Sequence, residues 1–246
     1  MNFILSLKTS DGTKIPVLFR PWHEHTGSWF WWGQNLCTTD EYKALWRMTA
    51  DYLNAHGAAD QIVYAYSTGT EPRDQASYLE RYPGHDLIDV LGFDAYQRED
   101  KDFFLKSMDT SLSVIDSIGK ANHKIIAITE TGYEGVPDST WWTGTLLPAM
   151  EKYPVAYVLV WRNAREKSHS LFLALIPDKP LPRISRSSLK IRKHCSPPIS
   201  TLYKITSYIN QINHVISSCR DGACPVSHHL IISFKAKTSW NNFKKK

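Results

Sequence analysis

Two glutamates follow apolar, strand-like segments of the chain. Glu24 lies in the stretch RPWHEHTGSWFWWG, where four tryptophans surround a single carboxylate, and Glu130 lies in KIIAITETG. Cleavage of a glycosidic bond needs one carboxyl group to protonate the leaving oxygen and a second to attack the sugar or activate water. The two glutamates are therefore a candidate catalytic pair. The alternative for each is a surface carboxylate beside a turn, which fits Glu24 less well because it follows an apolar segment.

The residues around Glu24 suit a surface that binds sugar rings. Arg20, His23 and Tyr96 could donate hydrogen bonds that move the pKa values of the two glutamates apart. Flat apolar rings are platforms on which pyranose rings stack. The candidates for this platform are Trp22, Trp29, Trp31 and Trp32.

The pair of histidines beside Glu24 raises the possibility of a metal site. HEHTG resembles the start of a zinc-protease helix, but that motif needs a second histidine at position 27, which is Gly27. The preceding segment is also strand-like and not helical. We therefore expect neither a metal nor a cofactor.

Strand-like and helix-like segments alternate along the chain. The strand-like segments are continuously apolar, a pattern typical of parallel strands covered by helices, and in such folds the chemistry gathers at the carboxyl ends of the strands. Strands are predicted at 15–22, 61–68, 87–97, 124–132 and 155–165, and helices at 38–57, 103–122 and 141–154. All five predicted strands end in polar or aromatic residues: His23 and Glu24, Ser67 and Thr68, Asp94 and Tyr96, Glu130 and Thr131, and Trp161, Arg162 and Asn163.

The charge of the chain changes abruptly near residue 167. Residues 1–167 carry 16 Lys and Arg against 22 Asp and Glu, a net charge of −6, whereas residues 168–246 carry 13 against 2, a net of +11. A single fold rarely changes composition so sharply, so a domain boundary is expected between 167 and 168. The spacing of the four cysteines matches neither a zinc site nor a dense disulfide framework, and no segment has the features of a signal peptide or a membrane span.

Five stretches resemble glycoside hydrolase family 26, whose best-known members are endo-β-1,4-mannanases. They are FRPWHEHTGSWFWWG, LWRMTADYL, DVLGFDAYQ, ITETGYEG and YPVAYVLVWRNAR, and together they cover nearly all of residues 10–167. The resemblance implies a (β/α)₈ TIM barrel, a member of the α/β class. It also implies a retaining double-displacement mechanism, with Glu24 as general acid/base after strand four and Glu130 as nucleophile after strand seven.

The same resemblance implies the sugar contacts. His23, Tyr96 and Trp161 are expected to bind the sugar at the cleavage site, with Trp29 or a neighbour stacking nearby. Trp32 and Arg162 complete the expected set of substrate-binding residues.

The chain departs from the family at two places. If the first strand is the family's fourth, strands 1–3 are missing, and so is the upstream secretion signal of this secreted or cell-surface family. After residue 167, an irregular basic tail replaces the family's closing segment. One set of codons for Ala174–Pro180, read one position out of frame, gives Pro-Tyr-Pro-Gly-Gln-Thr, which contains the family's Tyr-Pro-Gly. We therefore predict a partial catalytic barrel at 1–167 and a frameshifted tail at 168–246; a genuine basic appendage is the alternative.

The function predicted from these observations is endo-cleavage of β-1,4-mannosidic linkages in mannan, galactomannan or glucomannan. The expected partner is the polysaccharide, with no nucleic acid and no membrane span, and the chain is expected to be a monomer. Two alternatives remain open. One is an inactive fragment of such an enzyme, and the other is a related activity on xylan or mixed-linkage glucan.

Overall fold

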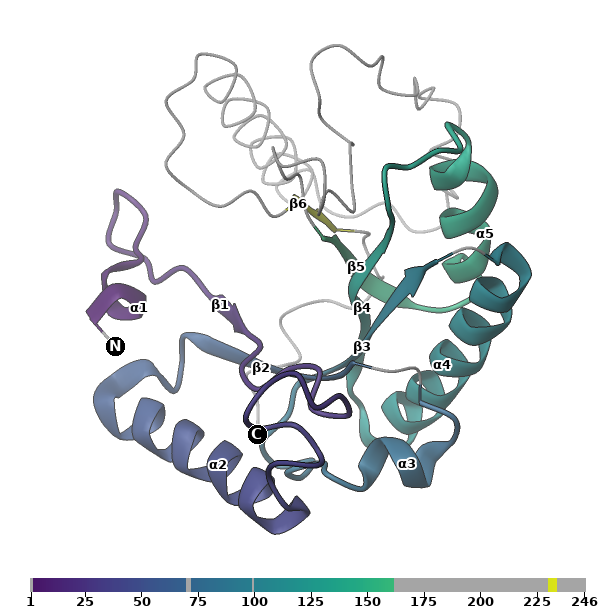
Figure 1. Cartoon of the computed structure of the whole chain (residues 1–246). Coiled ribbons are helices and arrows are strands. Elements are labelled where there is room, and N and C mark those ends of the chain that lie inside the picture. Colours follow the sequence, from purple (N-terminus) through teal and green to yellow (C-terminus); the bar gives the residue numbers. More distant parts are fainter. Residues whose placement is uncertain (1, 70–71, 99, 162–229, 234–246) are drawn as a thin grey trace. The chain divides into compact units, whose positions relative to one another are not determined.

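The apolar segments of the sequence form the strands of one curled sheet. The computed structural model describes residues 2–69, 72–98, 100–161 and 230–233, all within one compact unit (Figure 1). The strands β1 to β5 are parallel and adjacent in chain order, and β6 pairs with β5 in the antiparallel direction. Their bounds are β1 Val17–Phe19, β2 Ile62–Thr68, β3 Val90–Gln97, β4 Ile125–Tyr133, β5 Val155–Val160 and β6 Leu230–Ser233.

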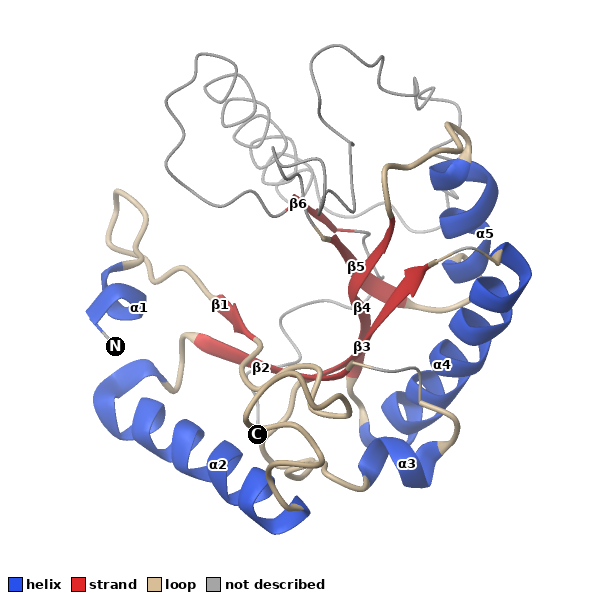
Figure 2. Cartoon of the chain, in the orientation of Figure 1, coloured by secondary structure: helices blue, strands red, loops and turns tan. Residues whose placement is uncertain are grey.

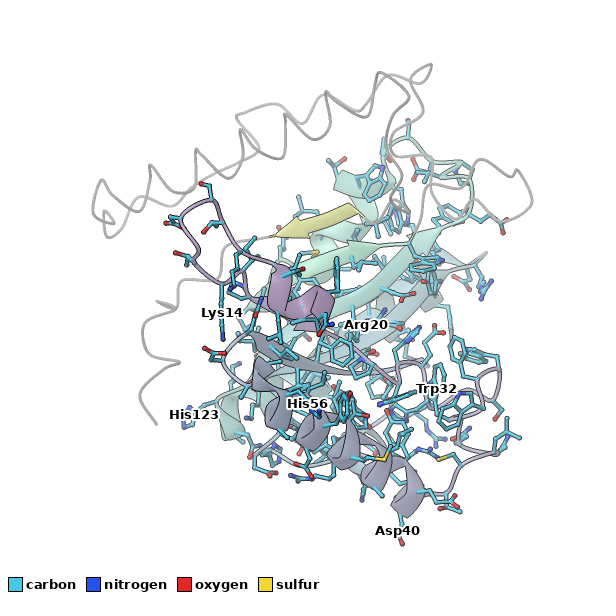
Figure 3. All side chains as sticks on the ribbon, turned by 90° about the vertical axis from the view of Figure 1, so that its left-hand side faces the viewer. Lys14, Arg20, Trp32, Asp40, His56 and His123 are labelled. Carbon is cyan, nitrogen blue, oxygen red and sulfur yellow. The ribbon has the colours of Figure 1, made fainter. Side chains whose placement is uncertain are left out.

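Helices connect the parallel strands and lie together on one side of the curved sheet (Figure 2). This arrangement is a partial (β/α)₈ barrel, as the sequence predicts. Asp40 in the first turn of α2 and His56 in η1 mark the two ends of the first connecting helix (Figure 3). The helices are α1 Asn2–Ser6, α2 Thr39–Leu53 with the π-helical turn η1 Asn54–Ala58, α3 Gln75–Leu79, α4 Lys101–Asn122, and the π-helical turn η2 Trp142–Leu146 with α5 Leu147–Met150.

The core has two parts because the strands are apolar on both faces. The larger part fills the space between sheet and helices and includes Trp46, Phe93 and Met108. A smaller cluster on the opposite face of the sheet contains Ala65, Val90, Ala127 and Tyr157. In β2, β3 and β4, where nearly every residue is buried, the polar residues are concentrated toward the carboxyl ends of the strands.

Several details differ from the sequence prediction. The strand predicted at 15–22 is paired only at Val17–Phe19. The elements α1, α3 and β6 were not predicted because all three are short, and β6 lies within the stretch predicted to be an irregular tail. The helix predicted at 141–154 is divided into η2 and α5, with a proline near the junction. Residues 162–165 of the fifth predicted strand lie outside the described residues. Among the described residues, no helix is both long and apolar enough to cross a bilayer.

Candidate active site

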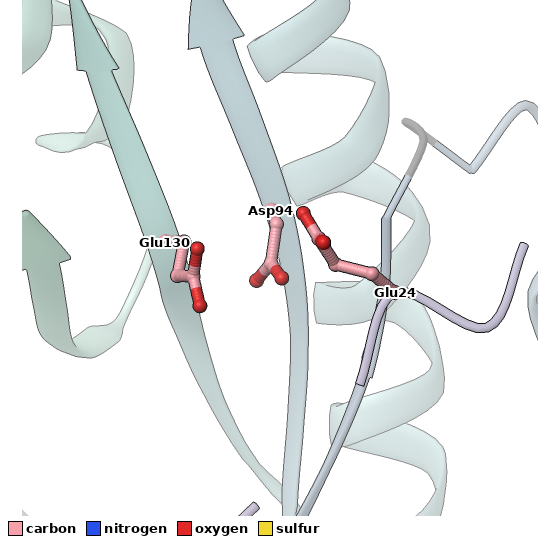
Figure 4. Close-up of side chains that lie close together, drawn as sticks. All are labelled: Glu24, Asp94 and Glu130. Atoms are coloured by element: carbon pink, nitrogen blue, oxygen red, sulfur yellow. The ribbon is translucent and has the colours of Figure 1, made fainter. Parts of the chain in front are cut away.

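Three carboxylates from separate segments meet near the carboxyl ends of the strands. Glu24 lies in the loop after β1, Asp94 in β3 and Glu130 in β4. One carboxylate oxygen from each lies within 4.8 Å of the others. Figure 4 shows the three side chains converging, with Asp94 between the two glutamates. The structure thus brings the predicted pair together and adds Asp94, which sequence reasoning had noted only as a polar residue at a strand end.

Arg20 supplies positive charge to this cluster. Its Nη1 donates to Asp94 Oδ2 and to Ser67 Oγ, each at 2.9 Å, and its Nη2 donates to Glu130. Burial lowers the pKa of Arg20, but attraction to Asp94 and Glu130 outweighs burial and raises it overall. Three carboxylates are also a possible ligand set for a divalent cation. Here the guanidinium of Arg20, which lies just after β1 (Figure 3), already pairs with two of them.

Glu130 is held on both of its oxygens. Its side chain is nearly inaccessible, with 4% of the residue exposed. Arg20 donates to Oε1, and the hydroxyl of Tyr96 donates to Oε2 at 2.5 Å. Burial, followed by the charge of Glu130, raises the pKa of Tyr96, so this hydroxyl keeps its proton and remains a donor. Glu130 is therefore a fixed carboxylate whose negative charge is compensated by two donors.

Glu24 lies in a different environment. It is half-buried, and its Oε2 accepts one hydrogen bond, from Trp29 Nε1 at 2.9 Å. Burial raises the pKa of Glu24; the bond from Trp29 opposes this shift and the nearby charge of Glu130 adds to it. A carboxyl group with a raised pKa retains its proton to higher pH, which suits a proton donor.

The loop that carries Glu24 has an unusual backbone. Trp22 and Glu24 both have φ of 54°, a left-handed conformation that costs a non-glycine residue about 1–3 kcal/mol. Two contacts hold the loop in place: Tyr42 Oη donates to Trp22 O at 2.8 Å, and Gly69 N donates to Thr26 Oγ1 at 2.9 Å. A Cβ on Gly69 would lie 2.6 Å from Glu24 Cβ, so only glycine lets the end of β2 approach this closely.

The four tryptophans predicted as a sugar platform divide into two pairs. Trp29 and Trp31 are 57% and 60% exposed and offer free ring surface. Trp22 and Trp32 are partly buried against the core, and Trp32 Nε1 donates to the backbone oxygen of His23 at 2.8 Å. The second pair therefore also shapes the loop.

The remaining predicted site residues lie as follows. His23 is half-buried beside the ring of Phe30, and burial lowers its pKa to about 4, so its imidazole is neutral near pH 7. Trp161 follows β5, where its backbone N–H donates to Thr131 O. Arg162 lies outside the described residues. His25 is buried between the rings of Tyr42 and Tyr66.

Comparisons with known proteins identify the family that this chain resembles. The glycosyl hydrolase family 26 pattern matches residues 4–162. A mannan endo-1,4-beta-mannosidase of Bifidobacterium adolescentis is 34% identical over 63% of this chain and 17% of its own length. A mannan endo-1,4-beta-mannosidase of Bacillus subtilis is 28% identical over 66% of this chain and 45% of its own length. A solved β-mannanase from Bacteroides ovatus is 55% identical over 74% of this chain and 51% of that chain, with a TM-score of 0.67. The chain thus spans about half of these proteins or less.

Proposed function

The chain belongs to glycosyl hydrolase family 26, and on this premise we propose that it cleaves β-1,4-mannosidic linkages within mannan, galactomannan or glucomannan. The relatives support this substrate because several are named mannan endo-1,4-beta-mannosidases. The single observation that carries the proposal is the convergence of Glu24 and Glu130 at the carboxyl ends of the strands. We further propose that the chain acts as a monomer on an extracellular polysaccharide.

The proposed mechanism retains the configuration of the sugar by two displacements. Glu130 attacks the anomeric carbon, while Glu24 gives its proton to the departing oxygen. Water then attacks the covalent glycosyl–Glu130 intermediate, as Glu24 takes a proton from that water and Glu130 leaves as a carboxylate. Retaining enzymes place the two carboxyl groups about 5–5.5 Å apart. The approach of the carboxylate oxygens within 4.8 Å is compatible with that spacing.

The environments of the two glutamates support these separate roles. A nucleophile must be ionised and fixed in orientation, and Glu130 receives hydrogen bonds from Arg20 and Tyr96. A general acid must be protonated at the working pH, and burial raises the pKa of Glu24. The opposite assignment would place the proton on the carboxylate that two donors already stabilise.

The surrounding side chains suit a sugar ring. We propose that the exposed face of Trp29 stacks against the substrate and that His23, Tyr96 and Trp161 contact the sugar bound at the cleavage site. Because its imidazole is neutral, His23 can donate a hydrogen bond to a sugar hydroxyl without placing a second charge beside Arg20. Trp32 and Arg162 are proposed as more distant contacts.

The test is release of reducing ends from β-mannan by the full chain, with Glu130→Ala as the control. Activity that disappears in the control, with a product that proton NMR first detects as the β anomer, supports the proposal. Parallel assays on xylan and mixed-linkage glucan separate mannan specificity from the related activities. A folded chain without activity on β-mannan would contradict the proposed function, and a product of inverted configuration would contradict the mechanism.

We also propose that the sequence of residues 168–246 does not belong to the family's catalytic domain and comes from a shifted reading frame, although β6 within it pairs with β5. The family match ends at residue 162, close to the change in charge after residue 167. Sequencing the gene across this junction tests the idea, since a reading frame without insertion or deletion relative to homologous genes would contradict it. Salt-dependent retention of the full chain on heparin would instead favour a basic appendage that binds anionic polymers.

A further inference from the structure

A β-bulge interrupts the pairing of β3 and β4 beside the three carboxylates. Phe93 pairs with Ile128, and the next residue, Asp94, pairs with Glu130. Thr129 is therefore an extra residue in β4. Such a bulge changes the direction of the side chains that follow it, and bulges are common next to active sites.

The bulge allows two consecutive side chains to reach the same cluster. In a regular strand, neighbouring side chains point to opposite faces. Here Thr129 Oγ1 donates to Asp94 Oδ1 at 2.7 Å, while Glu130 accepts from Arg20, which also binds Asp94. Thr129 is fully buried, so water does not compete for this hydroxyl.

A glycine on the neighbouring strand makes room for Thr129. A Cβ on Gly92 would lie 2.3 Å from Thr129 Cγ2 and 2.7 Å from its Oγ1. Any larger residue would therefore push the threonine away from Asp94. The close approach of β3 and β4 at this level depends on glycine at position 92.

The bond from Thr129 fixes how Asp94 meets Arg20. One oxygen of Asp94 accepts from Thr129 and the other from Arg20, so the carboxylate plane is set by two donors. We propose that Thr129 is a positioning residue, whose hydroxyl orients Asp94 so that Arg20 holds Glu130 for attack on the sugar. This inference rests on the proposed function for its effect on catalysis. The effect of the Thr129 hydroxyl on Asp94 can be measured without that function.

The direct test is NMR titration of the Asp94 carboxyl in the full chain, labelled with ¹³C in aspartate. Thr129→Val removes the hydroxyl and keeps the shape of the side chain. We expect it to raise the titration midpoint of Asp94 by about one pH unit, because a donor to the ionised form is lost. The charged and titratable groups near Asp94 are unchanged in the variant: Arg20, Glu24, Glu130, Tyr78, Tyr96 and Tyr157.

Two further variants serve as controls. Thr129→Ser keeps the hydroxyl and should leave the midpoint near that of the parent chain. Thr131→Val makes the same change two residues along β4, at a buried hydroxyl that has no hydrogen-bond partner in the described part of the chain. This variant should also leave the titration midpoint of Asp94 unchanged. If Thr129→Val does not fold, Thr129→Ala removes the same hydroxyl. An Asp94 midpoint unchanged by loss of the hydroxyl would overturn the inference.

Kinetics on β-mannan then separates positioning from substrate binding. Thr129→Val should lower kcat about tenfold with KM little changed, since the nucleophile is misplaced while the sugar contacts remain. Thr129→Ser should retain most of kcat. If the parent chain does not cleave mannan but the titration midpoint of Asp94 shifts as expected, the proposed function fails, while the orientation of Asp94 by Thr129 is supported. If the parent chain is active and Thr129→Val matches it in kcat, Thr129 does not position the nucleophile and the inference fails.

Discussion

The loop of residues 20–33 and strand β4 each present one glutamate to the same site, but in contrasting ways. Glu24 lies in irregular backbone with a φ of 54°, is half-buried and accepts one hydrogen bond, from Trp29. Glu130 lies within a nine-residue strand, is 4% exposed and accepts from Arg20 and Tyr96. Two identical side chains thus lie in different surroundings: burial raises the pKa of Glu24, whereas two donors hold Glu130, and such a contrast suits a site that combines acid and nucleophilic chemistry.

The contrast also follows the demands of the proposed reaction. A nucleophile must be held near its target, and a buried strand with charged neighbours is a rigid support. A general acid exchanges its proton with water in each cycle, and a partly exposed loop permits that exchange. Four predictions test this division between loop and strand.

The largest effects are expected from removing each glutamate. Glu130→Ala should lower kcat/KM at least about 10³-fold on every mannoside, because no covalent intermediate can form. Glu24→Ala should cause a similar loss on mannan but only about a tenfold loss on an aryl β-mannobioside, whose leaving group departs without a proton. Steady-state kinetics on both substrates measures the difference. If Glu24→Ala and Glu130→Ala lost equal activity on the aryl substrate, the assignment of Glu24 as acid and Glu130 as nucleophile would be contradicted.

Removing Arg20 should destabilise the part of the site that β3 and β4 supply. Arg20→Met leaves Asp94 and Glu130 buried without their cation and should lower the free energy of unfolding by about 3–5 kcal/mol. Arg47→Met is the matched control, since it breaks an exposed ion pair with Asp86 and should cost about 1 kcal/mol or less. Urea unfolding followed by circular dichroism measures both. Equal costs would show that the buried cluster does not depend on its arginine.

Displacing the loop should impair catalysis more than stability. In Gly69→Ala the new methyl group would collide with Glu24 Cβ and move the proposed acid, so kcat should fall about 10- to 100-fold. Gly144→Ala is the control, because its Cβ would meet only an ordinary contact, 3.4 Å from Thr140 Oγ1. Kinetics on β-mannan compares the two variants. Full activity in Gly69→Ala would mean that the position of Glu24 is not set by the end of β2.

The smallest effect concerns the proton on Glu24. The bond from Trp29 favours the ionised carboxylate, so Trp29→Phe should raise the pKa of Glu24 further. Since the acid must be protonated, the alkaline limb of the kcat/KM profile should move up by about half a pH unit. Trp31→Phe removes a similarly exposed indole that packs against Trp22 and Trp32, and should leave the limb in place. A shift to lower pH in Trp29→Phe would contradict the described hydrogen bond.

Most of the fold could be predicted because local sequence patterns encode it. The apolar segments at 61–68, 87–97 and 124–132 match β2, β3 and β4 within a few residues, and the helical periodicity at 103–122 matches α4. The short elements were missed because a few residues carry too little periodicity. The predicted boundary after residue 167 remains a prediction, as do the catalytic roles of Glu24 and Glu130.

The sequence by itself determined which segments alternate as strand and helix, and it placed Glu24 after one apolar segment and Glu130 toward the end of another. Only the tertiary structure decided that Arg20 joins Asp94 and Glu130, which lie 74 and 110 residues farther along the chain. The bulge at Thr129 and the burial of Asp94 were likewise absent from any local pattern. The physical reason is that periodicity is a property of neighbouring residues, whereas charge pairing and burial depend on which strands lie side by side.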